Sequence, residues 1–329
     1  MKSGEMERMP EGAHNSMTGD IAHGADAKEK ALIFLHIPKT AGTTLNSIIH
    51  RQYAPEVIYN VSGPDLAKSI QKFKTLDESE KRRIRLVRGH MPFGLHRYLD
   101  MPATYITMLR DPIDRVISDF YYVFEAPSHP LYQELMSKRV DLADFIRSRV
   151  PKGATNGQTR LISGVEKLNA IILNDADKYN LDLTQEPATT DTLEIAKRNL
   201  DEHFVVVGLS ERFDESLLLL RKALGWRNIY YVKRNVTKNR PSKQQLPRET
   251  IRLIEKHYDL DIQLYEHARQ RFEETIREQG AVFESELRSF RRNNKLYGTV
   301  WRSQVLTRDA ILKVKAVMGR GPAAKDERA

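Results

Sequence analysis

A lysine followed by small and hydroxyl-bearing residues gives the segment HIPKTAGTT, His36 to Thr44, the composition of a phosphate-binding loop. Lysine supplies a positive charge, and alanine and glycine let the backbone approach an anion closely. Threonine donates hydrogen bonds from its side chain and its main chain, and a helix that starts here adds the positive end of its dipole. The residues expected to surround the phosphate are Lys39, Thr40, Ala41, Gly42, Thr43 and Thr44.

The order of residues in this segment differs from that of a nucleoside-triphosphate loop, G-x-x-x-x-G-K-[ST], where the lysine follows the glycines. Lys39 precedes Gly42, and the segment holds no second glycine. It therefore favours a phosphate ligand other than a magnesium-bound triphosphate. A strand-to-helix turn with a solvated lysine has the same composition, so the segment alone leaves both interpretations open.

A second segment, LRDPIDRVISDFYY from Leu109 to Tyr122, offers a site for a second phosphate. Arg110 follows an apolar stretch, and its guanidinium has the fork geometry that suits phosphate oxygens. Ser118 lies on the second turn of the helix that Asp111 and Pro112 are expected to open. Arg110 and Ser118 can thus converge on one phosphate group, although the R-D-P triplet alone is a weak pattern.

Both segments follow apolar stretches that predict buried strands. Residues 31–37 are almost continuously apolar, which is typical of a strand covered on both faces. Further strands are predicted at 84–87, 104–109, 204–209 and 229–232. Helices are predicted between them, so we expect an α/β fold with a mostly parallel β-sheet flanked by helices. Ligands would collect at the carboxyl ends of the strands.

Capping residues indicate where the helices begin and end. Asp191 with Glu194 is the expected capping pair of one helix, and Gly225 the expected end of the next. Helices are predicted over residues 43–51, from Pro112 onward, over 191–200, over 213–224 and over 259–279. The chain is divided into a flexible polar leader, residues 1–30, an α/β domain, residues 31–280, and a basic helical C-terminal tail, residues 281–329.

Composition limits the chemistry and the compartment. The 329 residues include no cysteine, which excludes disulfides, a thiolate nucleophile and thiolate metal sites. No stretch reaches the roughly 18 apolar residues of a membrane span, and no signal peptide is recognisable, so a cytoplasmic location is expected. The net charge of +9 gathers in clusters at 81–97, 221–252 and 281–329. These clusters indicate either a localised anion site or solvated faces.

Together the two segments resemble the nucleotide-binding motifs of sulfotransferases that use 3′-phosphoadenosine 5′-phosphosulfate (PAPS). PKTAGTT is similar to the loop that holds the 5′-phosphosulfate, and RDPIDRVISDFYY to the element that holds the 3′-phosphate. The resemblance is to carbohydrate sulfotransferases of the heparan sulfate 2-O type and their bacterial homologues. RGHMPFG, from Arg88, and NLDEHFVVVGLSERFDESLLLL, from Asn199, extend it to roughly residues 31–280. It implies a P-loop-like nucleotide-binding sulfotransferase fold.

The resemblance also implies a role for each matching residue. Lys39 would contact the bridging region of the phosphosulfate, residues 40–44 would hold the 5′-phosphate, and Arg110 with Ser118 would hold the 3′-phosphate. His90 matches the general base of the family, and an attacking hydroxyl needs such a group to take its proton. No metal is implied, since cationic side chains and helix N-termini can neutralise the charge.

Three further assignments have competing interpretations. The basic loop KRNVTKNRPSK, residues 233–243, would close over the cofactor through Lys238 and Arg240, or is a solvated loop. The segment TNGQTR, residues 155–160, would face the acceptor, or is an ordinary polar loop. His96 is either a substrate-facing or a structural histidine.

The chain is expected to be a cytoplasmic bacterial member of the family, because it lacks the membrane anchor and the cysteines of the animal enzymes. It would transfer a sulfuryl group from PAPS to a hydroxyl on a glycan or glycolipid sugar, and no nucleic acid partner is expected. The basic tail would contact the inner membrane face peripherally, or is a docked or frayed helix. Two alternatives are a nucleotide-dependent phosphotransferase and a non-catalytic module that binds polyanions.

Overall fold

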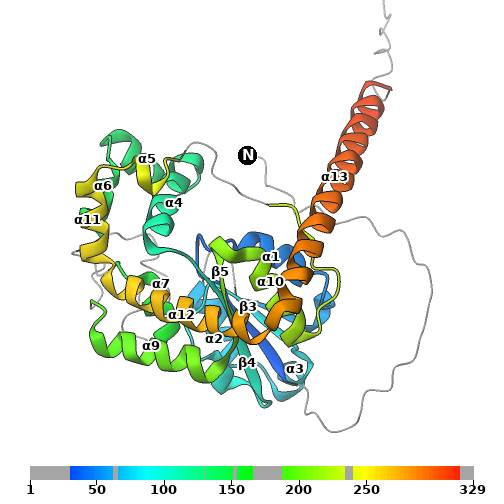
Figure 1. The fold of residues 1–329 in the computed structure, drawn as a ribbon, viewed down its shortest axis with the longest axis horizontal. Helices are drawn as coiled ribbons and strands as arrows, with labels where there is room; N and C mark the ends of the chain where they lie inside the picture. Colours follow the sequence, from blue (N-terminus) through cyan, green and yellow to red (C-terminus); the bar gives the residue numbers. More distant parts are fainter. Residues whose placement is uncertain are drawn as a thin grey trace, which may run out of the picture.

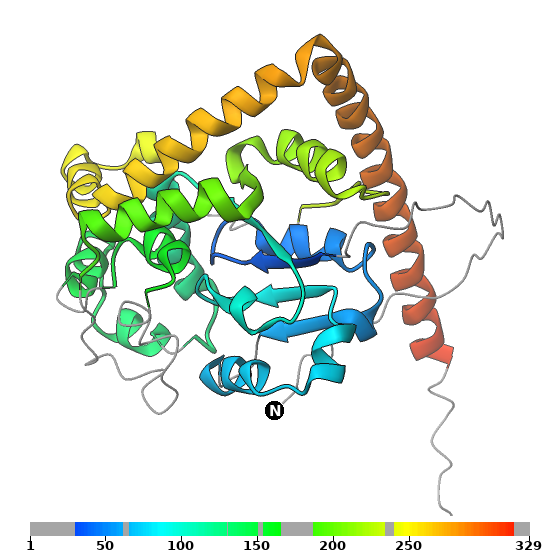
Figure 2. The ribbon, with the colours of Figure 1, turned by 90° about the horizontal axis from the view of Figure 1, so that it is seen from below.

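A computed structural model describes residues 30–61, 66–129, 131–150, 154–165, 187–233 and 240–318. These residues form a five-stranded parallel β-sheet flanked by helices (Figures 1 and 2). The strands, in the spatial order β2-β3-β1-β4-β5, are β1 (Ala31–Leu35), β2 (Ile58–Val61), β3 (Leu86–Gly89), β4 (Ala103–Leu109) and β5 (Phe204–Leu209). The α/β class and the parallel sheet predicted from the sequence are confirmed.

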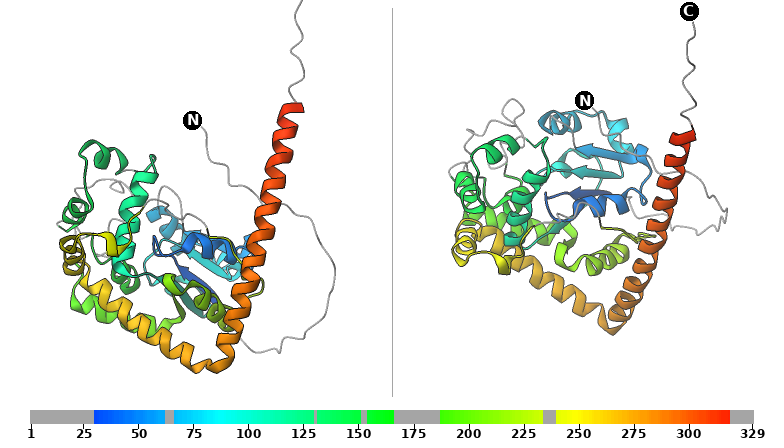
Figure 3. Two further views of the ribbon diagram at one scale, coloured as in Figure 1. Left: turned by 45° about the horizontal axis from the view of Figure 1, so that its top comes forward. Right: turned by 90° about the horizontal axis from the view of Figure 1, so that it is seen from above.

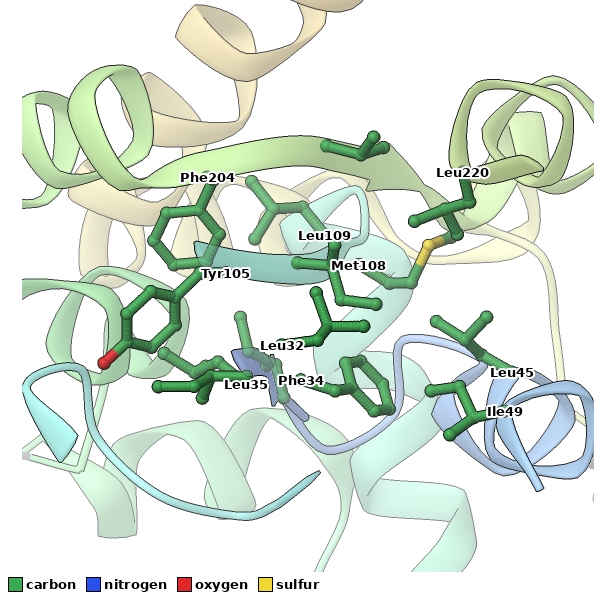
Figure 4. Close-up of a cluster of buried hydrophobic side chains, with 14 of the residues drawn as sticks. Leu32, Phe34, Leu35, Leu45, Ile49, Tyr105, Met108, Leu109, Phe204 and Leu220 are labelled. Carbon is green, nitrogen blue, oxygen red and sulfur yellow. The ribbon is translucent and has the colours of Figure 1, made fainter. Parts of the chain in front are cut away.

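β1 is the central strand of the sheet, because it pairs with β3 on one side and with β4 on the other. All five of its side chains are buried, which is why this stretch is continuously apolar. Figure 4 shows side chains of β1, β4 and β5 meeting those of two helices, α1 (Gly42–Ile49) and α10 (Phe213–Leu224). The two segments predicted to bind phosphate, residues 36–44 and 109–122, are called the phosphate segments below. They leave the sheet from neighbouring, well-packed strands.

The other helices form groups around the sheet. One group encloses a second apolar cluster around Phe120 and Phe145, and comprises α4 (Pro112–Glu125), α5 (Tyr132–Ser137), α6 (Leu142–Arg149) and α11 (Arg248–His257). A second group packs together next to β5, and comprises α7 (Gly157–Ser163), α9 (Thr190–His203) and α12 (Asp259–Glu278). Two shorter helices, α2 (Leu66–Lys74) and α3 (Glu78–Arg83), connect β2 to β3.

The predicted start of α4 and the predicted end of α10 are confirmed, whereas the predicted start of α9 is wrong. The carboxylate of Asp111 accepts a hydrogen bond from the first turn of α4, and Gly225 ends α10 with a φ of 66°. The α9 helix is capped by Thr189 in place of Asp191, and it runs to His203. Thr189 is the cap because the helix begins at Thr190, and its hydroxyl accepts a hydrogen bond from the Thr192 N–H in the first turn.

The predicted strand over residues 229–232 is wrong, because this segment has no regular secondary structure and pairs with no strand among the described residues. Side chains satisfy its backbone instead. Arg51 donates to a carbonyl of the segment, and the Oδ1 atom of Asn294 accepts from the Tyr231 N–H at 2.7 Å. Ile229 and Tyr231 are both buried. The alternating pattern thus reflects packing against helices, which sequence alone cannot distinguish from a β-ladder.

The described chain ends in one long helix, α13 (Gly280–Met318), which meets α12 at an angle and extends past the body of the protein (Figures 2 and 3). Gly280 has a φ of 70°, which lets the chain turn between the two helices. The first turns of α13 bury Phe283 and Phe290 in the main core. Residues 1–29 of the predicted leader lie outside the described residues.

Candidate active site

Between β1 and α1 the chain makes a tight loop with two left-handed residues, Lys39 (φ 69°) and Ala41 (φ 65°). Residues other than glycine rarely adopt this conformation, which costs roughly 1–2 kcal/mol per residue. Ala41 is the N-cap of α1 and provides no side-chain cap, so the positive end of the helix dipole faces the loop. Strained backbone at an uncapped helix start is typical of a loop shaped to hold an anion.

The threonines of this loop differ in what they can contribute. The Thr40 hydroxyl is buried and donates to the carbonyl oxygen of Ile37 at 2.8 Å, so it stabilises the loop and leaves the Thr40 main chain to contact a phosphate. Thr43 is exposed on the first turn of α1, whereas Thr44 is buried.

Gly42 has a packing role in addition to the one expected from the sequence. A Cβ atom at this position would lie 1.9 Å from Nε2 of His36, whose ring covers the start of α1. The glycine therefore makes room for a histidine and not only for an anion. His36 was not singled out as a functional candidate from the sequence, because its contact with Gly42 depends on how the loop folds back.

The ring of His36 also packs against the ring of His90, with centroids 4.2 Å apart. Burial, then the neighbouring His90 and Arg88, lower the pKa of His36 to about 3, so that its ring is neutral across the physiological range. The ring of Phe34 also stacks on the His36 ring, with centroids 5.3 Å apart. His36 is thus a neutral, fixed partner for His90.

His90 follows β3 and is oriented by one hydrogen bond, between its Nδ1 atom and the carbonyl oxygen of His36 at 2.8 Å. A carbonyl oxygen only accepts, so Nδ1 carries the proton and Nε2 has a lone pair. Burial lowers the pKa of His90, and the hydrogen bond to His36 opposes this shift. Its side chain is nevertheless exposed to solvent. His90 can therefore take a proton at Nε2 near neutral pH.

Arg110 joins the two phosphate segments directly. Its Nη1 atom donates to the carbonyl oxygen of Lys39 at 2.9 Å, and its Nε atom lies 3.9 Å from a carboxylate oxygen of Glu211. Burial lowers the pKa of Arg110, and the nearby charge of Arg240 adds to this effect. The pair with Glu211 is too long to neutralise the guanidinium fully. A buried, incompletely paired guanidinium is suited to an anion.

Lys39 and α4 provide the second contact between the segments. The Nζ atom of Lys39 lies 3.7 Å from the centre of the Tyr122 ring. Burial lowers the pKa of Lys39, and Asp119 on α4 opposes this shift. Ser118 is buried one helical turn before Tyr122, on the same side of α4. Tyr122 was missed in the sequence because its contact with Lys39 forms only when the loop and α4 are brought together by the fold.

Of the two residues assigned to the basic loop, Arg240 can be placed. Its Nη1 atom lies 3.3 Å from the carbonyl oxygen of Asp114 and 3.5 Å from a carboxylate oxygen of the same residue, on the first turn of α4. Lys243 forms an ion pair with Asp111 at 2.9 Å. Lys238 lies outside the described residues. The described part of this loop is therefore docked at α4, next to Arg110.

The remaining candidates have buried or hydrogen-bonded side chains. Of residues 155–160, the side chains of Gln158, Thr159 and Arg160 are buried on α7, so they do not form an exposed loop toward an acceptor. His96 bonds through Nδ1 to the Tyr105 hydroxyl at 2.8 Å, which favours the structural interpretation of this residue.

Among the described residues, no group of three or more histidine, aspartate or glutamate side chains could hold a metal ion. No described helix is long and apolar enough to span a bilayer.

Comparison with known proteins gives one family. A family model described as galactose-3-O-sulfotransferase matches residues 11–319. Galactose-3-O-sulfotransferase 3 of Mus musculus is 26% identical over 280 residues, which cover 80% of this chain and 62% of the relative. Galactosylceramide sulfotransferase of Mus musculus is 28% identical over 258 residues, 74% of this chain and 57% of the relative. Heparin sulfate O-sulfotransferase of Drosophila melanogaster is 24% identical over 280 residues, which cover 74% of this chain and 73% of the relative. The chain thus spans about three fifths of the length of the first two relatives.

Proposed function

Because the chain belongs to the galactose-3-O-sulfotransferase family, we propose that it transfers a sulfuryl group from PAPS to a hydroxyl group of a sugar. The observation that carries this proposal is the contact between Arg110 and the Lys39 carbonyl, which fixes two anion-binding segments at one edge of the sheet. PAPS carries two phosphate-containing groups on one ribose, and it therefore suits a site with two linked cationic centres.

The residues present suit this donor by their chemistry. Lys39 and the main chain of residues 40–44, at the start of α1, would hold the 5′-phosphosulfate. Arg110 and Ser118 would hold the 3′-phosphate, with Arg240 next to them and Lys238 from the same basic loop.

His90 is proposed as the general base. The acceptor hydroxyl attacks sulfur while the bond from sulfur to the phosphate oxygen breaks, and Nε2 of His90 takes the hydroxyl proton. Lys39 stabilises the negative charge that the phosphate gains as it leaves. The hydrogen bond from Nδ1 of His90 to His36 keeps the ring in the tautomer that this step needs.

The acceptor is proposed to be a carbohydrate, in a glycan or a glycolipid. Two of the similar relatives are named for galactose or galactosylceramide and one for heparin. A galactose hydroxyl is therefore the first acceptor to test, and a heparan-type polymer the second.

The test is thermal unfolding with adenosine 3′,5′-bisphosphate, the donor without its sulfuryl group, in parallel with ATP and magnesium. A ligand at one hundred times its dissociation constant adds about 2.7 kcal/mol to the folded state. Stabilisation by the bisphosphate alone, followed by sulfate transfer from PAPS to galactose-terminated acceptors, is the expected result. Stabilisation by ATP and magnesium alone would favour the phosphotransferase. Salt-sensitive binding to any polyanion, with no response to either nucleotide, would favour the binding module.

A further inference from the structure

We infer that Gln158 is a positioning residue that fixes the backbone of Arg110 and thereby sets the preference of the site for a 3′-phosphorylated nucleotide. The inference rests on the proposed function, because it concerns the 3′-phosphate of the donor. It assigns a role to a residue that contacts neither the donor loop nor His90 in the described contacts.

The side-chain amide of Gln158 pairs with both backbone polar groups of Arg110. The Arg110 N–H donates to Oε1 of Gln158 at 3.0 Å, and Nε2 of Gln158 donates to the Arg110 carbonyl oxygen at 3.0 Å. Arg110 directly follows Leu109, the last residue of β4 that pairs with β5. The Gln158 amide therefore takes over the hydrogen bonds at the point where the sheet ends.

Gln158 is itself fixed by a buried carboxylate. Asp261, on α12, is fully buried and accepts hydrogen bonds from the backbone N–H groups of Gln158 at 3.2 Å and Thr159 at 2.8 Å. It also accepts from the Thr159 hydroxyl at 2.9 Å and pairs with Arg115 at 3.3 Å. Asp261 thus caps the start of α7 from a different helix, and this holds the Gln158 side chain in its place.

Arg110 has to be placed accurately to hold a phosphate. Burial is the largest cause that lowers the pKa of Arg110; the charges of Arg240 and Arg115 add to this shift, and those of Glu211 and Asp114 oppose it. One donor of Arg110 is already committed to the Lys39 carbonyl. A small displacement of the guanidinium weakens a charge-assisted bond to phosphate strongly, so the position of the Arg110 backbone matters.

The test measures the affinity ratio between adenosine 3′,5′-bisphosphate and adenosine 5′-phosphate by calorimetry. Gln158→Met keeps the length of the side chain and removes both hydrogen bonds. We expect it to lower the preference for the bisphosphate by about tenfold, the value of one misplaced charged hydrogen bond, because the affinity for adenosine 5′-phosphate falls less than the affinity for the bisphosphate. A purely structural role would weaken both ligands equally.

Asn199→Leu is the matched control. Asn199 is buried on α9, and its Nδ2 atom donates to the carbonyl oxygens of Ile162 at 2.9 Å and Ser163 at 3.2 Å, at the opposite end of α7. Its loss destabilises the same helix without touching Arg110, so the affinity ratio is expected to stay at the wild-type value.

The outcomes separate the inference from the proposed function. A wild-type protein that binds both nucleotides equally overturns the proposed 3′-phosphate site, and the inference with it. A wild-type preference that Gln158→Met retains overturns the inference alone. If Gln158→Met does not fold, Gln158→Asn replaces it: the shorter amide stays polar but cannot reach both groups of Arg110, and a retained preference again overturns the inference.

Discussion

The His36 imidazole and the Cα atom of Gly42 occupy adjoining space with no room for a methyl group between them. This contact couples the start of α1 to the pair of histidines at the ends of β1 and β3. A change at residue 42 therefore displaces His36, and through it the ring of His90.

Gly42→Ala is expected to lower the free energy of unfolding by about 1–3 kcal/mol, because the added methyl group overpacks the site. It should also weaken binding of adenosine 3′,5′-bisphosphate, since the loop must shift. Urea unfolding and calorimetry measure the two effects.

Gly298→Ala is the control. Residue 298 lies in α13, and a Cβ atom added there would have no atom within 4 Å. Alanine is therefore expected to stabilise the helix by about 0.5–1 kcal/mol. Equal effects of the two variants would contradict the packing argument.

His90→Asn is expected to lower kcat by about 10²–10⁴-fold, the usual contribution of a general base, with the dissociation constant of the bisphosphate unchanged. The pKa of His90 is lowered by burial, so its base form is present throughout neutral pH. In the wild type the rate should therefore be flat at neutral pH and fall only as the pH drops below the ordinary histidine range. His96→Asn is the control, since His96 bonds to Tyr105 away from the loop. A His90→Asn variant with wild-type kcat would remove this residue from the chemistry.

His36→Phe is expected to flatten the dependence of stability on pH. The pKa of His36 is lowered to about 3 in the folded state, while in the unfolded chain it has its ordinary value of 6.5. Unfolding between these two values therefore takes up a proton, and stability falls as the pH falls through this window, by about 1.4 kcal/mol per pH unit for one proton. Urea unfolding at several pH values from 4 to 7, as rough limits of this window, gives both slopes. Identical slopes in the variant and the wild type would show that His36 is not the group that titrates.

Lys39→Gly and Lys39→Ala are expected to lose sulfuryl transfer to a similar extent, by about 10²–10³-fold, because both remove the charge at the leaving phosphate. They should differ in stability. Lys39 has a φ of 69°, so the glycine variant is expected to be more stable than the alanine variant by about 1 kcal/mol. Binding to an acidic polymer is the further readout, since the loss of one charge in a chain with 53 basic residues barely changes it. Full transfer activity in both variants would contradict the assigned role.

Much of the fold could be predicted from the sequence because its signals are local. The apolar stretch of β1 reports burial on both faces, and Asp111 and Gly225 report helix ends through hydrogen bonds within a few residues. Residues 229–232 have the same composition as a strand, and their true partners, Arg51 and Asn294, are far away in the sequence. β2, with only four residues, gave too short a pattern to recognise.

The residues of the candidate site also differ in whether the sequence alone could identify them. Lys39, His90 and Arg110 could be identified from the sequence because they lie in segments that resemble known motifs. His36 and Tyr122 could not be identified in this way, because each acts through a contact that only folding creates. Gln158 lies in a segment that the sequence pointed to as facing the acceptor, but its bonds to the Arg110 backbone, 48 residues away, carry no sequence signal.

The parallel register of the sheet places Leu35 of β1 opposite Gly89 of β3, so that the next residues along the chain, His36 and His90, emerge as neighbours. Successive residues of a strand point to opposite faces. A slip of one residue between these strands would turn the His90 ring away from the His36 carbonyl while leaving both histidines in the chain. The hydrogen bond that orients His90 thus depends on strand alignment as much as on residue type, and a single-residue insertion in β3 is expected to break it.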